Sequence, residues 1–144
     1  MGGKMVNYWL CVTNEKNWEV IKQRRLWGVS ERNRGKIERV RPGDFLIFYV
    51  KPKKILGIFK ATTKQFKSGE RIFDSTGFSE DEIFPYRIKL QPFALPENPI
   101  PIEKLIPELT FIISKRMWPG YFRKAMQAIP KEDFELVHSW TKNL

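Results

Sequence analysis

Apolar runs separated by charged and turn-forming segments predict the secondary structure of this chain. The run Tyr8–Thr13 is rich in β-formers, and Phe45–Val50 is apolar at every position. Both predict strands, and the lack of alternation in the second predicts burial on both of its faces. Ile55–Thr63 follows a charged connection and is expected to return as the partner strand of a hairpin. Ile83–Leu90 alternates loosely and predicts a further strand.

Helical spacing occurs near both ends of the chain. Asn17–Gln23 predicts a short helix after Asn14, a good capping residue, and Lys131–Trp140 predicts a terminal helix behind Pro130. Ser30–Arg39 is polar and cationic, and predicts a loop with a short helical turn. Thr110–Ser114 is a candidate strand. Arg41–Asp44 is expected to be a turn, and Gln65–Glu82 an irregular loop. Gln91–Pro101 is expected to be an extended proline-rich connector, and Pro119-Gly120 a chain break.

This order of a strand, a helix, several strands and terminal helices predicts an α+β fold with a small mixed or barrel-like sheet. The length of 144 residues predicts one domain over residues 1–144, long enough to bury a proper core. No window approaches about 18 apolar residues, and MGGKMV has no apolar signal core, so a soluble cytoplasmic protein with no membrane partner is expected. The lone Cys11, inside an apolar run, is expected to be a small core residue.

Positive charge is concentrated in one part of the chain. Lys plus Arg total 26 and Asp plus Glu total 16, a net charge of +10, and the segment Lys22–Arg41 holds eight cations and two acids. Such a balance favours a polyanionic partner, nucleic acid before an anionic membrane. The alternative is a solvated charged face.

Trp27 lies inside this cationic segment, beside small and polar residues. Gly28 leaves space next to the ring, and Ser30 and Asn33 offer groups for hydrogen bonds to a base edge. A base outside its stack needs a flat wall, partners for its edge and nearby cations, and all three are available here. The alternative is that Trp27 belongs to the core. Trp118, between basic and flexible residues, is a further candidate to line a pocket.

Catalytic and metal chemistry has little support in the sequence. His138 is the only histidine and Cys11 the only cysteine, which argues against a transition-metal site. There is no P-loop and no G-x-G-x-x-G motif. We therefore expect no catalytic group, no metal and no cofactor.

Several segments resemble one known family. YWLCVTNEKNWEVI, LWGVSERNRGKI, RPGDFLIFYV, ILGIF and the tail PGYFRKAMQAIPKEDFELV resemble the EVE domain of the PUA-like superfamily, over nearly the whole chain. The pattern is also similar to the YTH domain, which reads N6-methyladenine in RNA. The resemblance implies a PUA-like curved mixed sheet flanked by helices. It also implies a pocket for a modified base, such as methylated or hydroxymethylated cytosine.

The resemblance also implies roles for particular residues. By position, Asn14 matches a polar residue that contacts the base, Trp27 matches one wall of an aromatic cage, and Asn33 falls near a recurrent asparagine. The second YTH wall is a tryptophan that this chain lacks, and Phe78 is the expected substitute, with Phe73 and Trp118 as further candidates.

Together these arguments predict non-catalytic binding of a flipped, modified base in RNA or DNA. The predicted base contacts are Trp27, Asn14, Thr13, Ser30, Asn33, Phe78 and Trp118, and the predicted phosphate contacts are Arg25, Arg32, Arg34 and Lys36. One alternative is a PUA-like enzyme of amidohydrolase type, with Glu31 or Asp74 as its carboxylate beside a lysine. Another is a protein-interaction module that uses exposed Trp and Phe. The sequence leaves RNA versus DNA and the oligomeric state open.

Overall fold

The structure, a computed structural model, describes residues 5–79 and 81–142, so the predicted absence of a signal core falls largely outside it. The strands are β1 (Tyr8–Thr13), β2 (Leu26–Val29), β3 (Phe45–Val50), β4 (Lys54–Ala61), β5 (Phe66–Lys67), β6 (Tyr86–Ala94), β7 (Ile100–Pro101) and β8 (Met126–Ile129). The α-helices are α1 (Glu15–Arg24), α2 (Arg34–Ile37) and α3 (Lys131–Lys142), and the 3₁₀ segments are η1 (Glu31–Asn33), η2 (Ile102–Lys104), η3 (Ile106–Glu108) and η4 (Lys115–Phe122).

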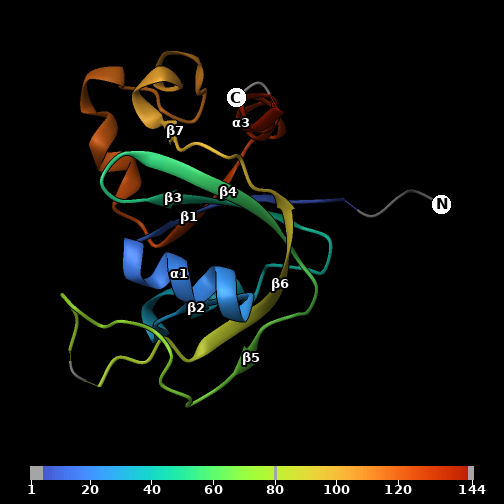
Figure 1. Cartoon of the computed structure of the whole chain (residues 1–144), viewed down its shortest axis with the longest axis vertical. Helices are drawn as coiled ribbons and strands as arrows, with labels where there is room; N and C mark the ends of the chain where they lie inside the picture. The colour runs from blue at the N-terminus through green and yellow to red at the C-terminus, as the bar shows by residue number, and fades with distance from the viewer. Residues whose placement is uncertain (1–4, 80, 143–144) are drawn as a thin grey trace.

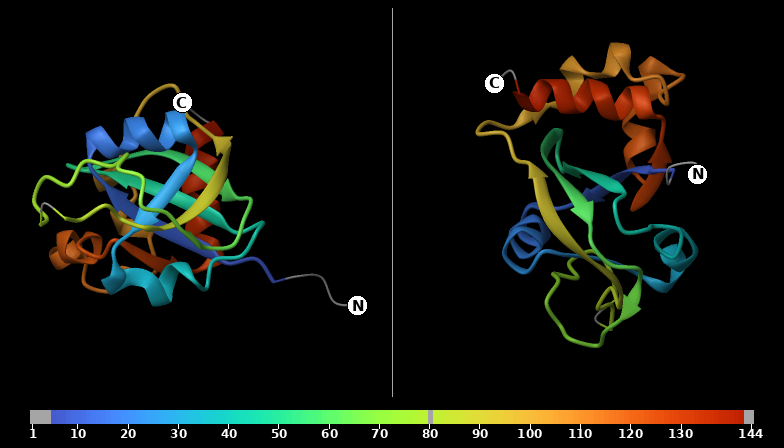
Figure 2. Two further views of the ribbon diagram at one scale, coloured as in Figure 1. Left: turned by 90° about the horizontal axis from the view of Figure 1, so that it is seen from below. Right: turned by 90° about the vertical axis from the view of Figure 1, so that its right-hand side faces the viewer.

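The described strands form one curled mixed sheet, which confirms the α+β prediction. Its order is β2-β6-β4-β3-β1-β8, with β5 paired to β6 and β7 paired to β4. β1 and β3 run parallel, and β3 and β4 form the predicted antiparallel pair. Helix α3 and the 3₁₀ segments η2, η3 and η4 lie at one end of the curled sheet, and α1, β2 and β5 lie at the other (Figure 1). A view at right angles places α1 and α2 on opposite sides of the sheet (Figure 2).

Alternate residues of the central strands enter two different hydrophobic cores. In β3, Leu46, Phe48 and Val50 pack with Trp18 and Trp27 in one core. The intervening Ile47 and Tyr49 pack in the second core, with residues of η2, η3 and α3. Because side chains of a strand point alternately to its two faces, a central strand between two cores must be apolar throughout. The prediction of a strand buried on both faces is confirmed, and Cys11 is fully buried, as predicted.

The predicted turn before β3 is held by a buried carboxylate. Gly43 adopts a φ of 98°, which a side chain would strain, and Asp44 is 1% exposed. The carboxylate of Asp44 accepts hydrogen bonds from the backbone N–H groups of Asn7 and Arg41 and from the indole N–H of Trp9. These bonds tie the turn to the start of β1.

Some sequence-based predictions were wrong. Thr110–Ser114 is not a strand, because the backbone N–H groups of Thr110 and Phe111 donate to Asp133 of α3 rather than to a neighbouring strand. Pro119-Gly120 lies within η4 and does not break the chain. The proline-rich connector contains the end of β6 and all of β7. β2 and β8 were not predicted as strands. No helix within the described ranges is long and apolar enough to cross a membrane.

Candidate functional site

A cavity of about 500 Å³ opens where five segments of the chain meet, one of which, the hairpin between β3 and β4, supplies Lys51. The end of β1 supplies Val12, Thr13 and Asn14. The segment from β2 to α2 supplies Trp27, Gly28, Val29, Ser30, Arg32, Asn33 and Lys36. The loop between β5 and β6 supplies Phe73, Phe78 and Phe84, and the segment before β8 supplies Arg123, Lys124 and Ala125. β1 and this last segment are joined by a hydrogen bond of 2.9 Å from Val12 N to Ala125 O. The volume is in the usual range of small-molecule sites.

Trp27 lines the cavity and also belongs to the hydrophobic core. Its side chain is 5% exposed and packs edge-to-face on Phe48, with 5.4 Å between ring centroids. Its indole Nε1 is buried and has no hydrogen-bond partner within the described part of the chain. A buried donor left in this state costs about 1–3 kcal/mol. The ring is therefore fixed in position and carries a buried, unsatisfied polar atom.

The wall opposite β2 is an aromatic loop, residues 68–79 and 81–84. The sequence predicted an irregular loop over Gln65–Glu82 and a strand from Ile83, but β6 begins only at Tyr86. Phe73 and Phe84 are half-buried and Phe78 is 59% exposed. Phe84 packs edge-to-face with both of the others, at centroid distances of 6.0 Å to Phe73 and 5.0 Å to Phe78. Phe84 was not predicted as a site residue. Its backbone φ of 52° is unusual for a residue other than glycine and turns the chain back into β6.

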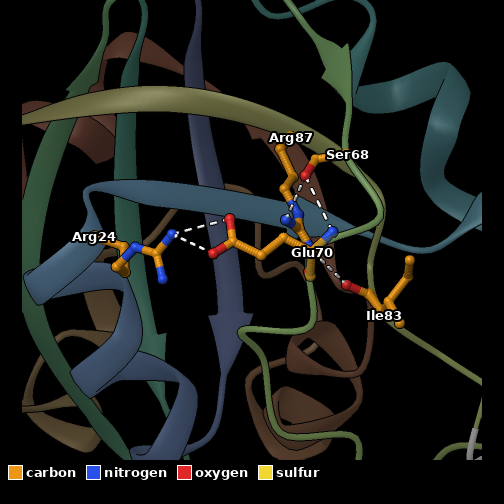
Figure 3. A network of polar contacts seen from close by, with 5 residues as sticks. All are labelled: Arg24, Ser68, Glu70, Ile83 and Arg87. Carbon is orange, nitrogen blue, oxygen red and sulfur yellow. Dashed lines mark hydrogen bonds and ion pairs between the residues drawn. The ribbon is translucent and has the colours of Figure 1, made fainter.

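Arg87 of β6 holds this aromatic loop in place (Figure 3). Its side chain is 0% exposed, and its guanidinium donates to Phe84 O at 3.0 Å, Ile83 O at 2.8 Å, Ser68 Oγ at 3.1 Å and Glu70 O. These acceptors lie at both ends of the loop. The guanidinium also lies 5.2 Å from the centre of the Phe73 ring. Burial is the main cause that lowers the pKa of Arg87, and the four hydrogen bonds offset the cost of desolvating the cation.

A second anchor holds the middle of the aromatic loop. The side chain of Asn17 accepts from Asp74 N at 2.6 Å and donates to Asp74 O at 3.0 Å. Asn14 accepts from Asn17 N as the N-cap of α1, and its amide nitrogen lies 3.5 Å from a carboxylate oxygen of Asp74. Asn14 also lines the cavity, but its side-chain oxygen already accepts the hydrogen bond that caps the helix.

Three other predicted polar residues line the cavity. Thr13 is 7% exposed, at the end of β1, and Ser30 and Asn33 are half-buried. Ser30 and Asn33 precede η1 and α2, respectively, yet neither side chain caps the helix that follows it. Their polar groups remain available to a ligand.

Five cations lie around the cavity, and no acidic residue among residues 5–79 and 81–142 lines it. They are Arg32, Lys36, Lys51, Arg123 and Lys124. None of the five is in an ion pair within the described ranges. Burial, followed by repulsion from Lys124 and Arg32, lowers the pKa of Lys36. Cations gathered in this way favour an anion at the rim of the cavity.

Sequence reasoning missed three of these five cations. Lys51 lies in the hairpin between β3 and β4, and Arg123 and Lys124 lie nearly a hundred residues after Trp27. A signal was present, because the segment 109–131 contains five cations and no acid. Only the pairing of β8 with β1 brings this segment to the cavity.

The structure does not bring every predicted site residue to the cavity. Arg25 is the exposed left-handed C-cap of α1. Arg34 lies 3.1 Å from Glu38 and stacks on Tyr86, and Glu38 is the first cause that raises its pKa. Trp118 is partly buried, packing on Phe122 and against the second core. These three residues are outside the set that lines the cavity, and local partners hold the side chains of Arg34 and Trp118 elsewhere.

Both carboxylates considered for catalysis also have structural partners. Glu31 accepts a hydrogen bond of 2.6 Å from the hydroxyl of Tyr86, which raises the pKa of that tyrosine. Asp74 accepts from Thr76 Oγ1 and lies against Asn14 and Asn17. Neither lines the cavity. In the part of the chain that the structure describes, no three His, Cys, Asp or Glu side chains gather as a metal site requires.

Known structures share this fold. The YTH domain of Zygosaccharomyces rouxii MRB1, solved in complex with N6-methyladenosine RNA, is similar with a TM-score of 0.66 at 12% identity, over 96% of this chain and 88% of that chain. Human THYN1, solved in complex with DNA containing 5-methylcytosine, is similar with a TM-score of 0.61 at 17% identity, over 94% and 98% of the two chains.

Relatives by sequence are similar along their whole length. A UPF0310 protein of Pyrococcus abyssi is 38% identical over 93% of this chain and 99% of its own, and one of Pyrococcus horikoshii is 37% identical over 92% and 97%. The family model of the EVE domain matches residues 7–140. The curled sheet, the resemblance of the sequence and this match agree: the chain belongs to the EVE domain family.

Proposed function

We propose that this protein is a non-catalytic nucleic-acid-binding domain that takes one flipped base of RNA or DNA into the cavity beside Trp27. One observation carries the proposal. Aromatic walls, uncommitted polar side chains and five cations meet in a single cavity of about 500 Å³, which no carboxylate of the described residues lines. A nucleotide combines the matching groups: a flat apolar base, a polar base edge and a phosphate.

The aromatic walls supply affinity for the base. Trp27 is fixed by the core, and the aromatic loop brings Phe73, Phe78 and Phe84 to the facing side. Stacking one base on an aromatic side chain contributes about 1–3 kcal/mol. A methyl group on the base adds about 0.8 kcal/mol when buried, so selectivity for a modified base by area alone is modest. The known complexes of MRB1 and THYN1 hold nucleic acids with methylated bases, which supports the same class of ligand here.

Edge contacts supply the remaining selectivity. The side chains of Ser30, Asn33 and Thr13 are assigned to the base edge. An acceptor atom on the base that reached Trp27 Nε1 would also satisfy the buried donor that now lacks a partner. A site built around such hydrogen bonds rejects a base that cannot make them more strongly than a purely apolar site does.

The cations supply affinity that depends on salt. Arg32, Lys36 and Lys124 are assigned to phosphates, and a phosphate near Lys36 would relieve the repulsion that lowers its pKa. For single strands, the logarithm of the affinity falls with the logarithm of the salt concentration by about 0.7 for each phosphate neutralised. Catalysis has no comparable support, because Glu31 and Asp74 do not line the cavity.

The test is a binding screen with a matched pair of variants. Modified and unmodified nucleosides and short RNA and DNA oligonucleotides are titrated into the protein by calorimetry. Phe78→Ala removes an exposed phenylalanine that lines the cavity, and Phe93→Ala removes one, 42% exposed, that does not. We expect Phe78→Ala alone to weaken binding by at least about fivefold, the lower end of one stacking contact. Equal effects of the two variants, or no binding to the unaltered protein, would contradict the proposal.

A further inference from the structure

A second hollow lies next to the cavity, beside η4, and we call it the η4 groove. It is about 570 Å³ in volume, and Arg116, Met117, Tyr121, Arg123, Lys124 and Gln127 are among its lining residues. Arg123 and Lys124 line both the groove and the cavity. The two hollows are therefore neighbours that share a cationic rim.

The groove carries the charge expected of a phosphate-binding surface. Arg116, Arg123 and Lys124 are exposed, and in the part of the chain that the structure describes no acidic residue lines the groove. None of these three cations is in an ion pair within residues 5–79 and 81–142. Lys124 is also close enough to Lys36 of the cavity to lower the pKa of that lysine. Positive charge thus continues from the cavity into the groove without a neutralising partner.

The groove also offers an apolar surface with a rigid support. Met117 is 64% exposed, and its polarisable, flexible side chain adapts to many contacts. Tyr121 is half-buried; its ring packs edge-to-face with Phe111 at 6.1 Å, its hydroxyl accepts from Ser114 N and its carbonyl accepts from Gln127 Nε2. An apolar surface beside cations is the arrangement that binds single-stranded nucleic acid without reading its sequence.

From this continuity we infer that the η4 groove binds the single strand that continues from the flipped nucleotide. The inference rests on the proposed function and extends it, because it makes the ligand an oligonucleotide rather than a free nucleoside. The occupant is a stretch of phosphodiester chain with its bases against Met117 and Tyr121. The groove reads no particular base, and it therefore adds affinity that is independent of the modification.

The experiment compares a modified nucleotide alone with single-stranded oligonucleotides that extend it by two nucleotides on the 5′ side, on the 3′ side or on both, each as RNA and as DNA. Arg116→Glu reverses a charge in the groove, and Lys104→Glu makes the same change in net charge at an exposed lysine that lines neither hollow. Met117→Ser removes the apolar contact without changing charge.

We expect one side of extension to raise the affinity of the unaltered protein. One phosphate contact to a single strand changes log affinity by about 0.7, or about fivefold, for each tenfold change in salt. Because Arg116→Glu removes one such contact, it is expected to weaken binding of that oligonucleotide by about fivefold at 0.1 M salt. Lys104→Glu is expected to have a smaller effect, and the isolated nucleotide is expected to bind all variants alike. Met117→Ser is expected to weaken only the extended ligand.

Each other outcome overturns a defined part of the account. If extension adds no affinity, or if Arg116→Glu and Lys104→Glu act equally, the groove is not a strand-binding surface, although the cavity still binds its nucleotide. If the unaltered protein binds neither the nucleotide nor any oligonucleotide, the proposed function itself fails and the inference fails with it.

Discussion

Gly28→Ala is the substitution that most directly perturbs the two sides of the cavity. A Cβ atom at Gly28 would lie 2.7 Å from Phe84 O, 2.8 Å from Phe73 Cε2 and 3.1 Å from Arg87 Cγ. Cβ atoms essentially never show contacts below 3.0 Å, so β2 and the aromatic loop would have to separate by several tenths of an ångström. Phe84 O cannot yield alone, because it accepts the hydrogen bond from Arg87 Nε.

The expected loss follows from the cost of overpacking, which is about 1–3 kcal/mol per added carbon in a tight site. For a chain of this size, 1 kcal/mol corresponds to about 3–4 °C in Tm, so a fall of about 3–12 °C is expected in a thermal melt. Because Phe73 must move, base binding is expected to fall more than phosphate binding does. The nucleotide affinity should therefore drop while the salt dependence of oligonucleotide binding is retained.

Gly35→Ala is the matched control. A Cβ atom there would meet nothing within 4 Å, and the residue lies in α2, where alanine is favoured over glycine by about 0.5–1 kcal/mol. Its Tm should stay the same or rise, with unchanged binding. If Gly28→Ala melts and binds like Gly35→Ala, the close packing of the aromatic loop on β2 is refuted.

Four further outcomes are expected. Trp27→Ala should destabilise the fold by about 3–5 kcal/mol in denaturant melts, because the ring belongs to the core. Trp27→Phe should stay folded and bind nucleotide more weakly. An unchanged denaturant melt of Trp27→Ala would contradict the placement of the ring in the core. Arg87→Met should leave three carbonyls and a hydroxyl without their donor and so destabilise the fold by about 3 kcal/mol or more. Amide hydrogen exchange should become faster in the aromatic loop more than elsewhere. An equal increase in exchange along the whole chain would count against Arg87 as the anchor of the loop. Arg32→Gln should reduce the slope of log affinity against log salt for oligonucleotide binding by about the contribution of one phosphate contact. Arg34→Gln should leave that slope unchanged, because Arg34 is already paired with Glu38. Equal slopes in the two variants would refute the assignment of Arg32, and not Arg34, to phosphate. Burial lowers the pKa of His138 from its usual 6.5, so the unfolded chain binds a proton more readily than the folded one, and the fold should lose stability as the pH falls below about 6.5. The Tm difference between pH 7.5 and pH 5.5 should therefore be smaller in His138→Gln than in the unaltered protein.

The sequence predicted the segments whose structure depends on local pattern. Tyr8–Thr13 and Phe45–Val50 are strands with the predicted bounds, because a run of β-formers between turn signals leaves few alternatives. The capping role of Asn14 follows from the same local chemistry. Met126–Ile129 was missed because its strand character comes from pairing with β1, which is distant in sequence.

The sequence predicted parts of both sides of the candidate site, because Phe78 and Phe73 were named for the facing wall and both line the cavity. Trp27, Ser30 and Asn33 lie close together in sequence beside a cationic run, and they line one cavity as that clustering indicates. The opposite side depends on Arg87, whose buried side chain positions a loop of irregular sequence. Trp118 was a candidate because it is aromatic, but packing on Phe122 decided its place. Sequence pattern does not encode such long-range contacts.

The most direct test of the central claim is whether a base, and not only a phosphate chain, enters the cavity. Chemical-shift mapping with ¹⁵N-labelled protein compares an oligonucleotide carrying a methylated base with one of equal length that is abasic at the same position. We predict that both ligands shift the signals of Arg123 and Lys124. Only the base-bearing one should shift the amides of Gly28, Ser30 and Asn33 and the indole N–H of Trp27. Identical shifts with the two ligands would contradict the account.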